Sequence, residues 1–275
     1  MNHKNPKKLD IDAVLKSKAK NHYNKIPKAA INYLKRAVHQ DELNHIIETY
    51  HDKHGSDFMQ ACVDYFNLTL HIKGEENLPE TGKFVFVSNH PLGGLDGICL
   101  AAILGAKYDK KIKYLVNDIL LNIENLESIF VPINKHGPQA KDSVNAMNKS
   151  YESENQIITF PAGLCSRKQK GKIKDLEWAK SFVVKAKAYK RDIIPIHFEG
   201  RNSNFFYNLS NLRMKAGIKL NIEMLYLANE MMKKKNAEFT ITFGKPIPWQ
   251  SLDSSKRPIQ WAQEIKESVY TLNKV

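Results

Sequence analysis

The pattern of apolar and polar positions changes its period near residue 67. Between Ile26 and His39 polar side chains recur every three or four residues and apolar ones fill the other side, which predicts an amphipathic basic helix. Two more helices are expected at 41–53 and, after the start signal Gly55-Ser56, at 57–66. The first 66 residues are therefore predicted to form an N-terminal helical segment.

Beyond residue 67, short apolar runs alternate with stretches of helical length. The runs predict strands at 68–72, 84–88, 112–116, 129–133, 156–160, 193–198 and 239–243. Helices are expected at 97–104, 139–152, 176–190, 220–234 and 258–272. This alternation predicts an α/β fold with a mostly parallel, twisted sheet of about six to seven strands flanked by helices. Residues 67–275 are expected to form that domain, after the helical segment 1–66.

Length and composition fit one folded domain and exclude several classes of protein. The chain has 275 residues, of which 42% are hydrophobic and 26% charged, as in a globular protein. Its longest nearly uninterrupted apolar run, 98–106, is far shorter than the roughly 20 residues that span a bilayer. The Lys-rich N-terminus lacks the apolar core of a secretory signal. Three cysteines without a CxxC pair favour a reducing cytoplasm over disulfides or a zinc ribbon.

The formal charge of +13 is concentrated in two stretches. Residues 1–36 and residues 165–191 each hold ten basic side chains against two acidic ones. Such an excess predicts an anionic partner. Nucleic acid, anionic lipid and an acidic protein all remain open at this point.

The segment 84–97, FVFVSNHPLGGLDG, places a His and an Asp in a loop between a strand and a helix. Catalytic groups of open α/β sheets lie at such carboxyl ends of strands. On one helix, residues six apart would point about 240° away from each other, so His90 and Asp96 can pair only if the loop folds back. Asp96 would then accept a hydrogen bond from one imidazole nitrogen and free the other as a base. The alternative is that His90 only caps or bridges backbone groups.

Four blocks in order resemble the signature of the glycerolipid (lysophosphatidic-acid-type, PlsC-like) acyltransferases. The first is Asn89-His90 with Asp96, the second FVPINK at 130–135, the third FPAGLCSR at 160–167 and the fourth IPI at 194–196. Together they cover about residues 68–250. The fuller strings NHPLGGLDG and HFEGRNSNFF resemble the bacterial, hemolysin-like branch that O-acylates lyso-aminolipids such as ornithine and glycine lipids.

Two positions depart from the family pattern. Five residues separate His90 from Asp96 where the family usually has four, and one of Gly93 and Gly94 is the residue suited to absorb the insertion. Ala162 stands where the family usually has Glu. A methyl group cannot do what that Glu does for a glycerol-phosphate acceptor, which favours a lyso-lipid other than lysophosphatidic acid.

The resemblance implies an O-acyltransferase of membrane lipid biosynthesis. His90 would take the proton of the acceptor hydroxyl, Asp96 would hold the imidazole, and an acyl thioester of acyl carrier protein or coenzyme A would be the co-substrate, with no metal and no other cofactor. Backbone N–H groups of the Gly93-Gly94 loop or of the next helix start are candidate oxyanion donors. Arg167 would fork onto an anion of the acceptor. The expected substrate-binding residues are Asn89, Gly93, Gly94, Lys135, Phe160, Pro161, Gly163, Ser166, Arg167 and Lys168.

Three alternatives remain beside this hypothesis. Cys165 could act as a thiol nucleophile with His90 as its base. The acceptor could be lysophosphatidic acid, which would make the protein a 1-acylglycerol-3-phosphate acyltransferase. A basic nucleic-acid-binding protein is the rival from another class, although the chain shows no nucleic-acid motif, so nucleic acid is not the expected partner.

The two basic stretches are then expected to have different partners. The one at 165–191 begins on the third block and is assigned to anions of the acceptor or donor. The one at 1–36 is assigned to the anionic surface of the cell membrane, where each well-placed Lys or Arg contributes about 1 kcal/mol. The sequence thus predicts a cytoplasmic protein that binds peripherally to the inner face of the membrane.

Overall fold

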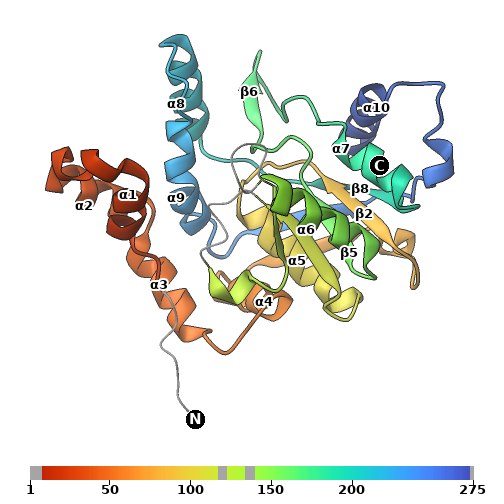
Figure 1. Ribbon diagram of the computed structural model, residues 1–275, viewed down its shortest axis with the longest axis horizontal. Coiled ribbons are helices and arrows are strands. Elements are labelled where there is room, and N and C mark those ends of the chain that lie inside the picture. The colour runs from red at the N-terminus through yellow and green to blue at the C-terminus, as the bar shows by residue number, and fades with distance from the viewer. Residues whose placement is uncertain (1–7, 117–122, 134–139, 273–275) are drawn as a thin grey trace.

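The computed structural model describes residues 8–116, 123–133 and 140–272, and its centre is one seven-stranded sheet (Figure 1). All neighbouring strands pair in parallel except β8 and β9, which are antiparallel. The mostly parallel sheet predicted from the sequence is thereby confirmed. In spatial order its strands are β1 (Thr69–Lys73), β9 (Glu238–Phe243), β8 (Asp192–Phe198), β2 (Phe84–Ser88), β5 (Gln156–Thr159), β3 (Ile112–Val116) and β4 (Phe130–Pro132).

Helices cover both faces of the sheet. Every residue of β2 is buried, as expected for a central strand with helices on either side. Phe84 and Phe86 pack in the core with α4 and α5, whereas Val85 and Val87 pack on the other face with α6, α7 and α10. The bounds of these helices are α4 (Ser56–Tyr65), α5 (Leu95–Lys107), α6 (Ala140–Glu152), α7 (Ser181–Ala188) and α10 (Pro258–Thr271).

The N-terminal segment is helical, as predicted, but its last helix belongs to the core. Its elements are α1 (Ile11–Ala19), the 3-10 helix η1 (Lys20–Lys25), α2 (Lys28–Ala37), α3 (Gln40–Thr49) and then α4. Phe58 and Cys62 of α4 are buried, and α4 lies so close to α5 that a Cβ on Gly105 would stand 2.2 Å from the Cβ of Ser56. Ile46 and Ile47 of α3 are buried in the same core, so a membrane-contact role of this N-terminal segment concerns mainly α1 and α2. Figure 1 shows α1 and α2 at the periphery, away from the sheet.

Two elements were absent from the sequence prediction. One is α8 (Asn204–Lys215), followed by the 3-10 helix η5 (Ile222–Tyr226) and α9 (Leu227–Met232), where a single helix over 220–234 was expected. The other is a hairpin of β6 (Arg167–Gln169) and β7 (Lys172–Lys174), whose turn residues Lys170 and Gly171 both have positive φ. Neither segment alternates cleanly between apolar and polar residues, because both lie on the surface beside the sheet.

Smaller features complete the description. The helix expected over 176–190 begins only at Ser181, because Trp178 turns inward and its indole donates to Asp175 at 2.9 Å. Three further 3-10 helices are η2 (Glu75–Asn77), η4 (Glu124–Leu126) and η6 (Trp249–Ser251). Within the described ranges, no helix has the length and apolar character needed to cross a membrane.

Candidate active site

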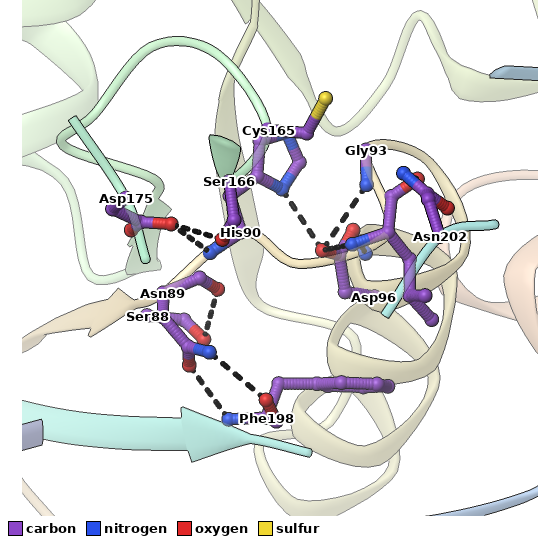
Figure 2. A network of polar contacts seen from close by, with 12 residues as sticks. Ser88, Asn89, His90, Gly93, Asp96, Cys165, Ser166, Asp175, Phe198 and Asn202 are labelled. Carbon is purple, nitrogen blue, oxygen red and sulfur yellow. Dashed lines mark hydrogen bonds and ion pairs between the residues drawn. The ribbon is translucent and has the colours of Figure 1, made fainter. Parts of the chain in front are cut away.

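The loop that follows β2 is tied to the end of β8 by the side chain of Asn89. Its amide nitrogen donates to the Phe198 carbonyl at 2.9 Å, and its amide oxygen accepts from the Phe198 N–H at 2.7 Å (Figure 2). Only 3% of Asn89 is exposed. The prediction that Asn89 binds substrate is thus corrected: its amide is occupied on both atoms by backbone and it fixes where the loop starts.

His90 and Asp96 form the pair that the sequence suggested. The loop folds back so that the imidazole Nδ1 lies 3.0 Å from Oδ2 of Asp96 (Figure 2). Asp96 is fully buried in the first turn of α5, where the helix dipole favours a carboxylate. Its oxygens also accept backbone N–H groups from Leu92 at 3.0 Å, Gly93 at 3.3 Å and Gly97 at 2.9 Å. The carboxylate therefore holds the imidazole and the shape of the loop together.

The imidazole is held on a second side by the first residue after β5. Its ring stacks on Phe160, with centroids 3.8 Å apart and an angle of 20° between the planes. Asp96 engages Nδ1, so Nε2 is the nitrogen that can take a proton from a substrate. The side chain of His90 remains 13% exposed, which leaves the ring reachable from solvent.

Gly93 and Gly94 shape the loop in different ways. Gly93 has a φ of 89°, and a Cβ there would stand 2.8 Å from the side chain of Leu227. Its N–H donates to Asp96, which corrects the prediction that this N–H is an oxyanion donor. Gly94 is the N-cap of α5 with a φ of −127°, so the insertion in the His-Asp spacing is absorbed at Gly93.

A buried carboxylate that sequence reasoning missed supports the backbone of His90. Asp175 accepts from the His90 N–H at 3.2 Å and from the Ser166 hydroxyl at 2.6 Å, while the Ser166 N–H donates to the His90 carbonyl at 2.7 Å. Burial raises the pKa of Asp175, and these hydrogen bonds oppose that shift. Ser166 is 2% exposed, so it positions the His90 loop instead of contacting substrate as predicted. In the sequence, Asp175 is one acid within a lysine-rich run.

Arg167 is not placed to fork onto an acceptor anion, which corrects that prediction. Its side chain is 3% exposed, and Nη2 lies 3.0 Å from Oε1 of the fully buried Glu223. Nη1 donates to the Cys165 carbonyl at 2.7 Å. The guanidinium is therefore held inside the protein, between the loop after β5 and the 3-10 helix η5, by a carboxylate that it shares with Arg213.

We expect Arg167→Met to destabilise the fold without a selective effect on acceptor binding. Glu223 keeps Arg213 as an ion-pair partner in this variant, so the cost comes from the lost hydrogen bonds of the Arg167 guanidinium to Glu223 and to the Cys165 carbonyl, about 1.5–3 kcal/mol. The midpoint temperature of thermal unfolding should fall by several degrees, while the KM of the folded protein for the acceptor should stay unchanged. A variant with native stability and a strongly raised acceptor KM would restore the anion-binding role.

The other predicted substrate-binding residues lie around the same loops. Pro161 is buried and its carbonyl accepts from Ala179 at 3.0 Å; Gly163, with a φ of 70°, is exposed. Lys168 is half-buried on β6, outside the His90 pair. Lys135 lies outside the described residues.

Cys165 does not have the chemistry of a nucleophile. The side chain is fully buried, and burial raises the pKa of its thiol to about 11 even though Arg167 lowers it. The thiol is therefore protonated near neutral pH, whereas a cysteine nucleophile reacts as the thiolate. In the part of the chain that the structure describes, no three His, Cys, Asp or Glu side chains converge as metal ligands.

The sheet and the His-Asp pair define a class, and comparison with known proteins agrees. A family model described as acyltransferase matches residues 13–274. The chain belongs to this acyltransferase family and is an acyltransferase. The PlsC 1-acyl-sn-glycerophosphate acyltransferase of Thermotoga maritima has a similar fold, with a TM-score of 0.52 and 15% identity over 80% of this chain and 78% of that one.

Two curated relatives are much more similar in sequence. The lyso-glycine lipid O-acyltransferase of Bacteroides thetaiotaomicron is 53% identical over 264 residues, which cover 96% of this chain and 97% of that protein. A protein of the same name from Phocaeicola vulgatus is also 53% identical, over 96% of this chain and 95% of its own. These relatives support the lyso-lipid branch that the sequence strings resemble.

Proposed function

We propose that this acyltransferase moves a fatty acyl group from an acyl thioester to the hydroxyl of a lyso-glycine lipid. The reaction rests on the contact between His90 and Asp96 at the carboxyl end of β2. The acceptor rests on the two relatives of that name, which match almost the whole chain.

In the proposed mechanism His90 acts as general base. Nε2 takes the proton of the acceptor hydroxyl while Asp96 accepts from Nδ1 and stabilises the imidazolium that forms. The hydroxyl oxygen attacks the thioester carbonyl, the new C–O bond forms, and the C–S bond breaks. The thiolate leaves and takes the proton from Nε2, which regenerates neutral His90. No covalent intermediate on the protein is required.

The charges around the site support an acceptor without a phosphate monoester. Arg167 lies in the family block that ends in an arginine, but its side chain is buried and already paired with Glu223. Ala162, in the position of the usual Glu, packs against the apolar core on the face of the sheet that α6, α7 and α10 cover. A glycine lipid carries a single carboxylate, so it requires fewer cationic hydrogen-bond donors in the site than a doubly charged phosphate does.

The same proposal places the enzyme at the inner face of the cell membrane, with acyl carrier protein or coenzyme A carrying the acyl group. Helix α2 supports peripheral contact: Ile31 is buried, whereas Lys28, Asn32 and Arg36 are exposed. Its cationic face suits anionic headgroups.

Acceptor competition tests this function. Purified protein is given lyso-glycine lipid, lyso-ornithine lipid and lysophosphatidic acid, each with acyl carrier protein or coenzyme A thioesters, and the products are identified by mass spectrometry. We expect kcat/KM for lyso-glycine lipid to exceed that for lysophosphatidic acid by at least about tenfold, the discrimination that 1.4 kcal/mol of binding provides. Equal or better use of lysophosphatidic acid would overturn the acceptor assignment.

A further inference from the structure

The end of α8 and the loop to η5 expose several large apolar side chains within one short stretch of the chain. Exposed fractions are 65% for Leu212, 50% for Met214, 45% for Ile218 and 72% for Leu220. Single exposed apolar residues are ordinary on a protein surface, but a continuous group marks an interaction site. We call residues 212–225 the apolar tip; Figure 1 shows α8 extending outward from the body of the molecule.

Several backbone groups of the tip are bonded within it. Helix α8 ends in a Schellman motif: Gly217, with a φ of 69°, donates to Met214 at 3.1 Å, and Ile218 donates to Arg213 at 3.1 Å. The buried Arg213 guanidinium also donates to the Ile218 carbonyl at 2.8 Å and pairs with Glu223 at 2.9 Å. A turn with its polar groups satisfied can leave water at low cost.

Exposed cations surround the apolar tip. Lys215 and Lys219 lie within it, and the only acid between residues 200 and 229 is the fully buried Glu223. The β6–β7 hairpin contacts α8 and exposes Lys170 and Lys172 at its turn. A cationic rim around an apolar centre matches an anionic bilayer and repels a second copy of the same face.

The same elements touch the loops that hold His90. Met224 of η5 contacts Cys165, with the sulfurs 3.9 Å apart, and Leu227 packs against Gly93. The hairpin starts at Arg167, directly after Ser166, which bonds the backbone of His90. A bilayer held at the apolar tip would thus be linked through η5 and the hairpin to the loops that hold His90.

We propose that the apolar tip inserts into the interface of an anionic bilayer, with lysines of the tip and the hairpin on lipid headgroups. This is a second membrane contact, distinct from the basic N-terminal helices; its role in delivering the acceptor rests on the proposed function. The insertion itself is a property of the surface and can be measured without turnover.

The test compares two charge-matched double variants in vesicle flotation. In L212E/L220E both acids lie on the tip, whereas in V144E/V184E they replace exposed valines, 44% and 45% exposed, on α6 and α7. Vesicles contain phosphatidylglycerol mixed with phosphatidylcholine, or phosphatidylcholine alone. We expect L212E/L220E to lose at least about tenfold in partitioning onto the anionic vesicles, since two exposed leucines that would enter the bilayer are exchanged for charges. V144E/V184E should bind like the native protein.

Other results of these experiments would contradict insertion of the tip or assign it to a different partner. Equal binding by L212E/L220E and the native protein would overturn the inference, as would an equal loss in V144E/V184E. Sedimentation of the native protein that shows a dimer broken by L212E/L220E would assign the tip to a second copy, and loss of binding to acidic acyl carrier protein alone would assign it to the donor. A native protein that binds vesicles through the tip but acylates no acceptor would refute only the proposed function. Thermal unfolding of both variants confirms that they fold.

Discussion

His90→Ala is expected to remove acyl transfer almost completely while the protein stays folded. The substitution deletes the nitrogen that takes the proton of the acceptor hydroxyl, and general-base catalysis contributes roughly 10²–10⁴-fold to such reactions. The fold should survive because the imidazole is at the rim of the site, 13% exposed, with its ring resting on Phe160. The measurement is kcat with a saturating acyl thioester and lyso-glycine lipid, alongside thermal unfolding.

A second histidine provides the control. His71 lies exposed on β1, paired with Glu238 at 3.0 Å and outside the loop after β2. His71→Ala should keep native kcat. If His90→Ala also turned over at a near-native rate, His90 would be a structural residue that bridges the loop, and the proposed mechanism would be wrong.

Much of the fold can be predicted from local sequence because buried strands such as β2 consist almost entirely of consecutive apolar residues. The FVFVS run of β2 is buried on both faces, and its bounds match the prediction from sequence. The hairpin and α8 could not be found in this way. Polar residues dominate the hairpin and exposed apolar residues interrupt the pattern of α8, since neither element builds the central sheet.

The site shows the same division between local and distant contacts. His90 and Asp96 are six residues apart, so one loop with glycines can bring them together, and the sequence was enough to suggest the pair. Asp175 and Glu223 act across the fold, on His90 and Arg167 respectively. Nothing near Arg167 in the sequence shows that it pairs with a residue 56 positions later.

Asp96→Asn is expected to lower kcat by about 10⁴-fold, the size of effect known where a buried carboxylate that orients a catalytic histidine becomes an amide. In the native protein, Oδ2 of Asp96 accepts from the N–H groups of Leu92 and Gly93 and contacts Nδ1 of His90. An asparagine has only one oxygen that can accept, because an NH₂ group replaces the other carboxylate oxygen. If the amide oxygen takes the place of Oδ2, the amide nitrogen faces the Gly97 N–H, which donates to Oδ1 at 2.9 Å in the native protein, so two donors meet. In either orientation of the amide, the imidazolium loses its counter-charge.

Asp57→Asn is the matched control for Asp96→Asn, because Asp57 occupies the same second position, in the first turn of α4, and pairs with Lys110 on the surface. Both variants remove one carboxylate from a helix N-terminus, so a general helix-dipole effect would appear in both. Only Asp96→Asn should lose turnover. It should also lose about 1–3 kcal/mol of stability from a mismatched backbone donor. If kcat instead stayed near native while stability fell, Asp96 would serve the loop alone, and His90 would act as a base without a carboxylate partner.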